Sequence, residues 1–251
     1  MNALLTSTSP PFEPGCQRRL VGSVMERGAV SAADRDQMFN LLSAYFTGTR
    51  RDQFEADLAE KDAVILLRDS ATGSIQGFST FLRLDGEDLA AFYSGDTIVA
   101  REYWGESLLS RLWSRTVFAE ADRIRAARPT TRVYWLLICS GYKTWRFLPV
   151  FFRRYWPNAG GPTPASVQRI LDDLGSRRFG AQYANGVVRF RHPMPLRGGI
   201  AEVTEQRLRD PRVAFFARMN PGHAAGDELV CLTEISRENL TPAGERMLGE
   251  S

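Results

Sequence analysis

The stretch YSGDTIVAREYWGESLLSRLW, from Tyr93 to Trp113, joins a β-rich segment to an amphipathic helix through a short polar loop. The loop contains Gly105, and small residues at a strand-to-helix junction leave the first amides of the helix without partners. These amides and the positive end of the helix dipole can bind an anion, but such a junction also serves simply to turn the chain. The pattern of the segments on either side decides between an anion site and a simple turn.

The segments before this stretch predict two helices and then three antiparallel strands. Ser31 is a favourable N-cap, and apolar residues follow it at helical spacing. Three β-rich runs come next, separated by turn sequences, as in a meander of antiparallel strands. The expected elements are helices at 31–46 and 50–60 and strands at 62–69, 74–85 and 89–99.

The segments after it predict a crossover to a parallel strand. A helix over 105–127, closed by Pro129, leads to RVYWLLIC at 132–139, whose continuous apolar character is typical of a strand covered on both faces. A strand, a long helix and a second strand form a right-handed crossover, so the two strands are expected to be parallel. An aromatic helix follows, which Pro149 either kinks or divides into two helices. The later expected elements are helices at 164–178 and 201–208 and strands at 186–190 and 228–235.

This order of elements resembles the GNAT superfamily of acyltransferases over about residues 31–155. In that family the fourth strand ends in a valine, a loop of the type Arg/Gln-x-x-Gly-x-Gly/Ala follows, and the next helix opens with leucines. Here Val99 ends the strand, the loop is Glu102–Ser107, and Leu108 and Leu109 open the helix. The resemblance implies an α/β (α+β) fold, a mixed and mostly antiparallel sheet flanked by helices. The expected organisation is a flexible tail at 1–16, a GNAT-like acyltransferase domain at 17–190 and a C-terminal extension at 191–251 that packs on or completes the same domain.

The resemblance also implies a cofactor at the junction: a coenzyme A thioester (acetyl-CoA or a longer acyl-CoA), or the phosphopantetheine of an acyl carrier protein. Its diphosphate would lie at the loop, where Gly105 lets the backbone approach closely and Ser107 is too small to obstruct it. The pantetheine arm would pair with the end of the strand as an added strand does. The implied cofactor-binding residues are Ile98, Val99, Ala100, Trp104, Gly105, Glu106, Ser107 and Leu108.

The implied reaction is N-acyl transfer to the amine of a small molecule or amino acid. It needs a base for the nucleophile, donors for the oxyanion and an acid for the leaving thiolate. Asp96 is the first candidate for the base and Glu102 the second, although Ser-Gly-Asp is also typical of a bulge or turn. The family often uses a tyrosine on the helix after the fifth strand as the acid. Tyr142 is favoured over Tyr155 for this role, although neither matches the family's Asn-x-x-Ala-x-x-x-Tyr pattern.

Two acidic residues depart from the family pattern. Glu102 replaces the basic or amide residue at the start of the loop, and Glu106 adds a second carboxylate beside the expected phosphates. Negative charges there are unfavourable unless both side chains turn outward. The departures leave two alternatives open: a catalytically inactive GNAT-like module that binds or regulates, and an interaction domain in which the loop is purely structural.

The segment YKTWRFLPVFFRRYWP, residues 142–157, contains seven aromatic residues. One interpretation is an apolar tunnel for an acyl chain longer than acetyl, with the neighbouring basic side chains facing CoA phosphates or an acidic carrier protein. The other is that the aromatics pack the helix onto the sheet and the basic residues form its solvated face. The aromatic residues are Tyr142, Trp145, Phe147, Phe151, Phe152, Tyr155 and Trp156, and the basic ones are Lys143, Arg146, Arg153 and Arg154.

The composition argues against several other classes. The 251 residues are 43% hydrophobic and 24% charged, which is typical of a soluble globular protein, and a net charge of +3 is too small to indicate nucleic-acid binding. The three cysteines lack a Cys-x-x-Cys motif and the two histidines are isolated, so neither a disulfide framework nor a metal site is expected, and Cys139 is expected to be a buried thiol. No signal peptide or membrane-spanning run is apparent, so a cytoplasmic location without membrane insertion is expected.

Overall fold

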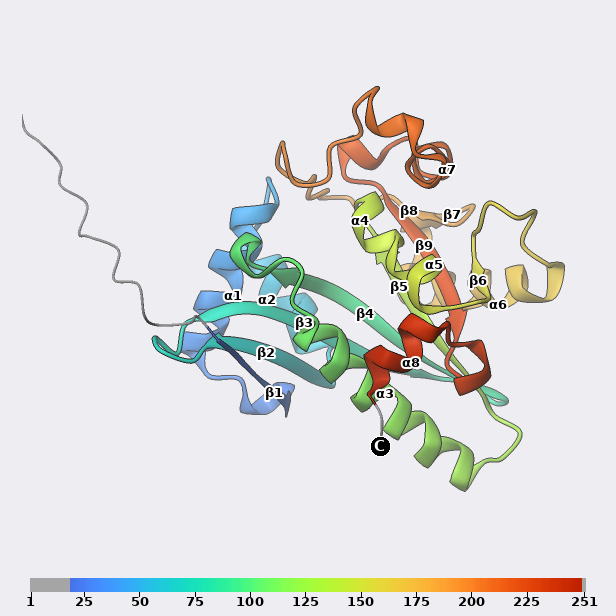
Figure 1. Cartoon of the computed structure of the whole chain (residues 1–251), viewed down its shortest axis with the longest axis horizontal. Coiled ribbons are helices and arrows are strands. Elements are labelled where there is room, and N and C mark those ends of the chain that lie inside the picture. The colour runs from blue at the N-terminus through green and yellow to red at the C-terminus, as the bar shows by residue number, and fades with distance from the viewer. Residues whose placement is uncertain (1–18, 250–251) are drawn as a thin grey trace, which may run out of the picture.

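Nine strands form one mixed sheet in the computed structural model, which describes residues 19–249 (Figure 1). The strand order is β1-β2-β3-β4-β5-β9-β8-β7, with β6 paired to β9. Among the strand pairs of this range only β4 and β5 run parallel, as the predicted crossover requires. The predicted mixed, mostly antiparallel sheet is confirmed, whereas the predicted tail at 1–16 lies outside the described residues. The strands are β1 (Leu20–Glu26), β2 (Ala63–Asp69), β3 (Ile75–Asp85), β4 (Leu89–Val99), β5 (Arg132–Cys139), β6 (Tyr155–Trp156), β7 (Tyr183–Ala184), β8 (Val187–Val188) and β9 (Glu228–Glu234).

Helices flank the sheet on both faces (Figure 1). The first begins where the sequence predicts, because Ser31 Oγ accepts a hydrogen bond from the amide of Asp34 at 3.1 Å. The crossover helix begins at Leu108, three residues later than expected. The helices are α1 (Ala32–Tyr45), α2 (Arg51–Ala59), α3 (Leu108–Ala127), α4 (Tyr142–Trp145), α5 (Phe147–Phe151), α6 (Ala165–Phe179), α7 (Pro211–Met219) and α8 (Pro242–Leu248).

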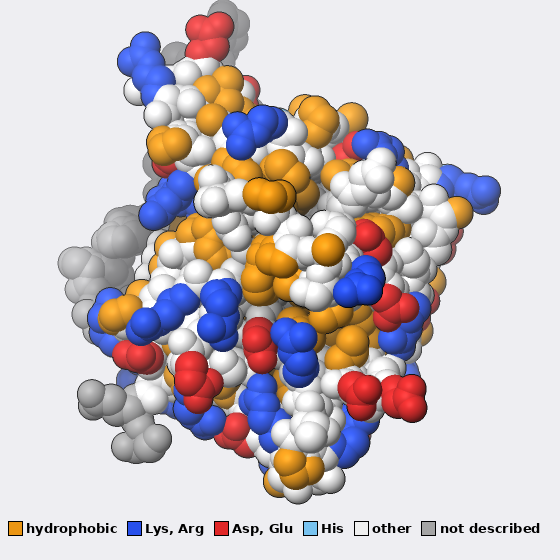
Figure 2. Space-filling view, turned by 90° about the vertical axis from the view of Figure 1, so that its right-hand side faces the viewer, with side chains coloured by type: hydrophobic (Ala, Val, Ile, Leu, Met, Phe, Trp, Pro, Cys, Tyr) orange, Lys and Arg blue, Asp and Glu red, His pale blue; other side chains and the backbone are white. Residues whose placement is uncertain are grey.

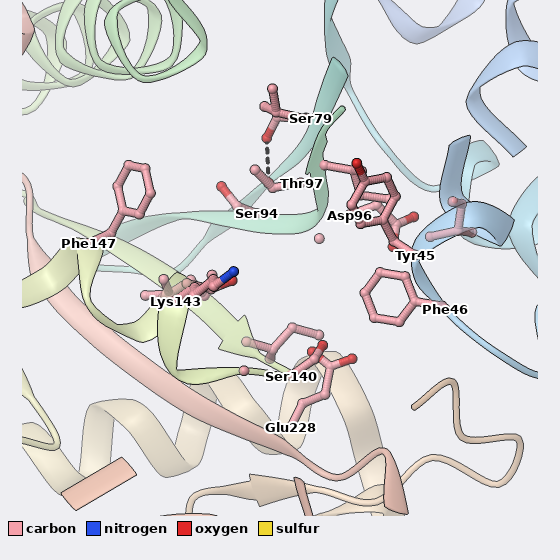
Figure 3. A pocket seen from close by; sticks show the side chains of 18 of the residues that line it. Tyr45, Phe46, Ser79, Ser94, Asp96, Thr97, Ser140, Lys143, Phe147 and Glu228 are labelled. Carbon is pink, nitrogen blue, oxygen red and sulfur yellow. Dashed lines mark hydrogen bonds between the residues drawn. The ribbon is translucent and has the colours of Figure 1, made fainter. Parts of the chain in front are cut away.

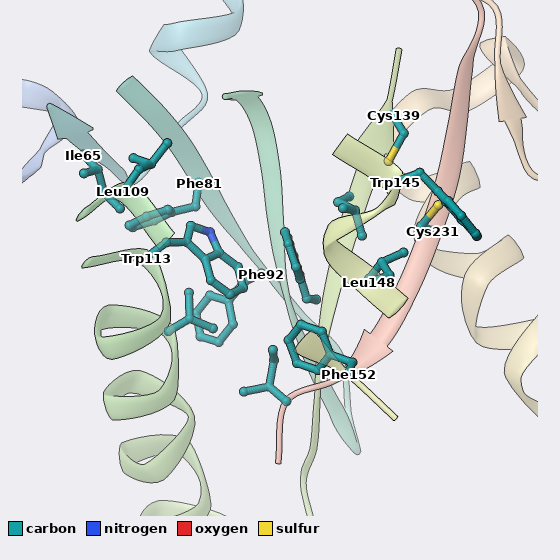
Figure 4. Packing of buried hydrophobic residues seen from close by; sticks show 14 of the residues in the cluster. Ile65, Phe81, Phe92, Leu109, Trp113, Cys139, Trp145, Leu148, Phe152 and Cys231 are labelled. Carbon is teal, nitrogen blue, oxygen red and sulfur yellow. The ribbon is translucent and has the colours of Figure 1, made fainter. Parts of the chain in front are cut away.

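Three groups of buried side chains hold these helices on the sheet. The largest packs α3, α4, α5 and α7 on one face, and Trp113 and Val117 of α3 belong to it (Figure 4). On the other face α1 and α2 pack over β2–β4, and α6 packs over β4, β5 and β9. Each large apolar side chain that is fully buried contributes about 1.5–3 kcal/mol, so packing rather than helix propensity positions these helices. Cys139 is fully buried in the largest group, as expected.

The aromatic segment is divided into three elements rather than forming one helix. The break between α4 and α5 comes at Arg146, ahead of Pro149, and the segment then ends in β6. Trp145 and Phe152 are buried in the core, each 1% exposed, whereas Phe147 and Phe151 line a cavity. The packing interpretation therefore applies to part of the segment, and the tunnel for an acyl chain stays a prediction.

The C-terminal region contributes a central strand, because β9 lies between β5 and β8. The predicted helix at 201–208 is wrong: the helix in this region is α7, which starts at Pro211 with Asp210 as its N-cap. The sequence reasoning also missed β1, an edge strand paired with β2. The polar sequence after β9 forms α8, which packs against α3 and α5.

Charges of both signs are interspersed on the face shown in Figure 2, with apolar side chains between them. No extended area of basic side chains appears on that face, which agrees with the small net charge of +3.

Candidate functional site

A β-bulge in β4 lies beside the site. Thr80 of β3 opposes two residues of β4, Gly95 and Asp96, so β4 carries the extra residue. The parallel pairing of β4 with β5 ends at Ser94 and Leu137. Beyond this point the two strands no longer pair, although both continue, and an opening separates them. The bulge therefore places Asp96 at the start of the opening.

Two tryptophans lie at the point where the strands separate. Ser94 Oγ accepts hydrogen bonds from Nε1 of Trp113 and Nε1 of Trp135, both at 3.0 Å. The two ring centroids are 4.1 Å apart, and both rings line the cavity described next. Because both indoles converge on one hydroxyl, α3 and β5 are held in a defined position relative to β4.

A cavity of about 680 Å³ occupies the opening and extends to both sides of the sheet (Figure 3). On the α3 side its walls are apolar and largely aromatic. On the opposite side, between α2 and α6, its walls carry several charged groups. The apolar walls include Leu109, Trp113, Trp135, Phe147, Phe151 and Met247, and the polar walls include Asp57, Glu60, Tyr93, Asp96, Arg178 and Glu228.

The carboxyl group of Asp96 has a pKa near neutral pH. Burial and then the negative charge of Asp57 raise its pKa to about 7, although the positive charge of Lys61 opposes the rise. A carboxylate with a pKa near the working pH is suited to accept a proton during a reaction. The first sequence-predicted base thus lies in the cavity with suitable electrostatics.

Glu228, the first residue of β9, carries a second carboxyl group across the cavity from Asp96 (Figure 3). It is only 9% exposed, and burial and the charge of Asp96 raise its pKa to about 8, while a hydrogen bond with Ser140 lowers it. The sequence reasoning missed this residue. The available signal was an acidic residue at the start of the otherwise apolar run ELVCLTEI.

An ion-paired group lies beside Asp96. Lys61 Nζ lies 2.5 Å from a carboxylate oxygen of Asp57, although the Lys61 side chain is fully buried. Arg178 of α6 pairs with Asp57 at 2.9 Å and with Glu60 at 2.8 Å, and so connects α6 to α2. The two cations of this group therefore already have acidic partners, whereas none of the ion pairs found in residues 19–249 includes Asp96 or Glu228.

The loop at the other end of the cavity has features of an anion site. Gly105 has φ +106°, a conformation that favours glycine, and the first turn of α3 has no side-chain cap. Lys143 Nζ lies 3.9 Å from the centroid of the Trp104 ring. Burial lowers the pKa of Lys143, and so do the nearby charges of Arg207 and Arg101, which indicates that cations cluster here.

At the end of β4, fewer backbone groups are free to pair with a pantetheine arm than the sequence predicts. The amide of Ala100 donates to Gln76 O at 2.7 Å, so Val99 turns its own polar groups away from β3 toward the opening. The carbonyl of Val99 already accepts a hydrogen bond from Trp104 Nε1 at 2.8 Å. Of the predicted cofactor-binding residues, Ile98, Val99, Trp104, Gly105 and Glu106 line the cavity, and Ala100, Ser107 and Leu108 do not.

The other predicted catalytic residues lie away from the cavity. Glu102 is exposed and does not line it. Tyr142 is 1% exposed within the core, and its hydroxyl accepts a hydrogen bond from Arg207. Tyr155 also lies outside the cavity walls. Tyr93 lines the cavity instead, and burial and the neighbouring carboxylates raise its pKa well above the ordinary value.

Two features are absent from residues 19–249. This range contains no group of three or more His, Cys, Asp or Glu side chains that could hold a metal ion. Within the same range, no helix is both long and apolar enough to cross a membrane.

No family model and no curated protein matches this sequence. Solved structures with a similar arrangement include a GNAT family N-acetyltransferase from Escherichia coli in complex with CoA, at 18% identity and a TM-score of 0.35, covering 54% of this chain and 71% of that one. A GNAT family acetyltransferase from Staphylococcus aureus is 12% identical with a TM-score of 0.37 and covers 57% and 90%. A ribosomal-protein-alanine N-acetyltransferase from Brucella melitensis is 12% identical with a TM-score of 0.38 and covers 58% and 96%.

These structures come from the superfamily that the element order of the sequence resembles. At such low identities and TM-scores they assign no activity or substrate to this chain.

Proposed function

We propose that the protein is an N-acyltransferase of the GNAT type, which transfers an acyl group from a coenzyme A thioester to an amine. The main support is the position of Asp96, at a bulge in β4 and inside a cavity that opens between two parallel strands. A buried carboxyl group with a pKa of about 7 at this position is a suitable general base.

In the proposed reaction the amine nitrogen attacks the thioester carbonyl, so that a C–N bond forms and the C–S bond breaks. Asp96 accepts the proton that the amine loses, and the departing thiolate gains a proton. Tyr93 is the candidate donor for that proton, because it lines the same cavity and its raised pKa keeps its hydroxyl protonated at neutral pH.

The loop before α3 is proposed to hold the diphosphate of coenzyme A. Its support is the uncapped first turn of α3, the open backbone at Gly105 and the positive charge of Lys143. Free amides at a helix N-terminus and a nearby cation both favour an anion. Glu106, which also lines the cavity, would have to turn away from the phosphates.

The experiment that tests the activity follows release of free thiol from acetyl-, octanoyl- and palmitoyl-CoA in the presence of a panel of amines. Thiol release that depends on an amine supports the transferase. Binding of acyl-CoA without release for any amine would instead favour the inactive binding module. An absence of binding to every acyl-CoA would remove the free thioester as the donor, and the same assay with an acylated carrier protein would then test the phosphopantetheine alternative.

We propose further that the acyl chain is longer than acetyl and lies against the aromatic walls on the α3 side of the cavity. Octanoyl-CoA is then expected to bind at least about 10-fold more tightly than acetyl-CoA, because each buried methylene contributes about 0.8 kcal/mol. Phe147→Ala should reduce this difference, since Phe147 lines the cavity. Val150→Ala is the matched control, because Val150 is a similarly exposed residue of α5 outside the cavity walls. Calorimetric affinities that do not change with chain length would contradict this prediction.

Trp104 is expected to compete with the pantetheine arm for the carbonyl of Val99. Trp104→Phe removes the indole donor but keeps an aromatic ring beside Lys143. The variant should bind CoA about 2-fold to 10-fold more tightly, because a hydrogen bond contributes about 0.5–1.5 kcal/mol net. Isothermal titration calorimetry with CoA measures this change. Weaker binding by the variant would show that the indole itself contacts the ligand.

A further inference from the structure

The charged groups on the polar side of the cavity do not neutralise one another. Lys61 and Arg178 are paired with Asp57 and Glu60, at 2.5–2.9 Å. Asp96 and Glu228 remain, and within the described part of the chain neither belongs to an ion pair. A buried carboxyl group tends to stay protonated unless a positive charge beside it favours the ionised form, as the raised pKa values of Asp96 and Glu228 show. A cationic ligand would allow both groups to ionise, so this side of the cavity is suited to one.

The hydroxyl of Tyr93 is a second and independent sign of a ligand. The side chain is 3% exposed and lines the cavity, its hydroxyl oxygen is open to the cavity, and none of the hydrogen bonds found between residues 19 and 249 includes it. Buried hydroxyl groups normally have a hydrogen-bond partner. Tyr93 lines the same cavity as Asp96 and Glu228. A nitrogen group bound there could supply the missing partner.

The two carboxyl groups lie on different strands and face the cavity from opposite sides, with the Phe46 ring at the side between them (Figure 3). Asp96 belongs to β4, and Glu228 belongs to β9, which is separated from β4 by β5. A small group with a single charge at Asp96 would leave Glu228 without a positively charged partner. An extended molecule could contact both carboxyl groups at once.

In acyl transfer, Asp96 and Glu228 would have different roles. A protonated amine loses one proton to solvent before it can attack and a second proton as the amide forms, so the reacting nitrogen carries no positive charge in the product. If Asp96 takes the second proton, a single amine leaves no cation to neutralise Glu228. A second basic group, which does not react, would stay positively charged through the whole reaction.

We infer that the acceptor is a molecule with two basic nitrogen groups, such as an aliphatic diamine, whose reacting amine lies at Asp96 and whose second cationic group lies at Glu228. This inference rests on the proposed acyl transfer. It makes Glu228 a specificity-determining residue, because it contacts the end of the acceptor that does not react.

The test compares the four-carbon diamine putrescine with butylamine, which has the same chain and only one amine. With octanoyl-CoA as donor, the wild-type protein should show kcat/KM at least about 10-fold higher for putrescine than for butylamine. Glu228→Gln should lower this ratio by about 10-fold, mainly by raising KM for putrescine, and Glu228→Asp should restore part of it because it keeps the charge.

The matched control is Glu234→Gln, because Glu234 lies at the other end of β9 and outside the cavity walls. It should leave the ratio as in the wild type. Equal use of both amines by the wild type would overturn the inference, and so would a ratio that Glu228→Gln leaves unchanged.

A binding measurement keeps this inference distinct from the proposed activity. Putrescine should raise Tm more than butylamine does, and Glu228→Gln should abolish the difference. If no amine releases thiol from acyl-CoA but this difference in Tm is found, acyl transfer is wrong and the diamine site stands. If thiol is released with amines but neither the kinetic ratio nor Tm distinguishes putrescine from butylamine, the transferase stands and the diamine site is wrong.

Discussion

Replacing Asp96 with Asn is expected to lower kcat/KM for acyl transfer by roughly 100-fold to 10,000-fold, which is the usual contribution of a general base. The amide of Asn is similar in size to the carboxyl group but cannot accept the proton of the amine. Binding of acyl-CoA should change little, because Asp96 lies on the polar side of the cavity and the proposed phosphate site lies at the loop before α3. Amine-dependent release of free thiol measures the effect.

The pH dependence gives a second measurement of the same residue. Asp96 has to be deprotonated to act as the base, and its pKa is raised to about 7. In the wild type kcat/KM should therefore fall as the pH is lowered through about 7, by roughly 10-fold per pH unit well below the pKa. The Asp96→Asn variant should lack this fall. An unchanged pH profile in the variant would assign the titration to another group.

Glu102→Gln is the matched control, because Glu102 was the other carboxylate that the sequence offered as a base. It is exposed and does not line the cavity. Its replacement should leave kcat/KM close to the wild-type value. A large loss in this variant together with a small loss in Asp96→Asn would reverse the assignment of the base.

Replacing Gly105 with Val is expected to weaken binding of CoA by roughly 10-fold or more. Gly105 has φ +106°, which a β-branched residue adopts only with strain, although the space beside it is open. The loop should therefore change conformation and move the free amides at the start of α3. A hydrogen bond to a charged group is worth about 1.5–3 kcal/mol, so the loss of one such bond accounts for this change. Thermal shift with CoA measures it.

Gly73→Val is the matched control for backbone strain. Gly73 has φ +71°, also lies in open space, and belongs to the turn between β2 and β3, away from the cavity walls. Both variants should have a lower Tm than the wild type in the absence of ligand. Only Gly105→Val should lose the stabilisation by CoA, and equal stabilisation of both variants would exclude Gly105 from the phosphate site.

The order of elements and the position of the base could be predicted from the chain because each depends on local patterns. Alternation, helical spacing and the N-cap at Ser31 are properties of neighbouring residues, so the helices and strands from α1 to β5 were predicted with nearly correct bounds, whereas β1 was missed. The run Ser-Gly-Asp indicated a bulge, and the bulge brings Asp96 into the opening. The loop at Gly105 follows from the same local signals.

The second carboxylate and the acid depend on contacts between distant segments. Glu228 faces Asp96 across the cavity because β9 pairs with β5, and no periodicity in either segment specifies that pairing. Tyr142 did not match the family's tyrosine pattern, and packing in the largest buried group and a hydrogen bond from Arg207 keep it in the core.

Local sequence thus predicted the elements from α1 to β5 and the position of Asp96 near the end of β4, because backbone conformation depends mainly on near neighbours. The charge balance of the cavity required the fold itself. Burial and pairing in space determine which carboxylates have partners, and Asp57 and Glu60 gain theirs from Lys61 and from the distant Arg178. Asp96 and Glu228 gain no ion-pair partner within residues 19–249, and that difference in tertiary contacts identifies the end of the cavity that is suited to a cation.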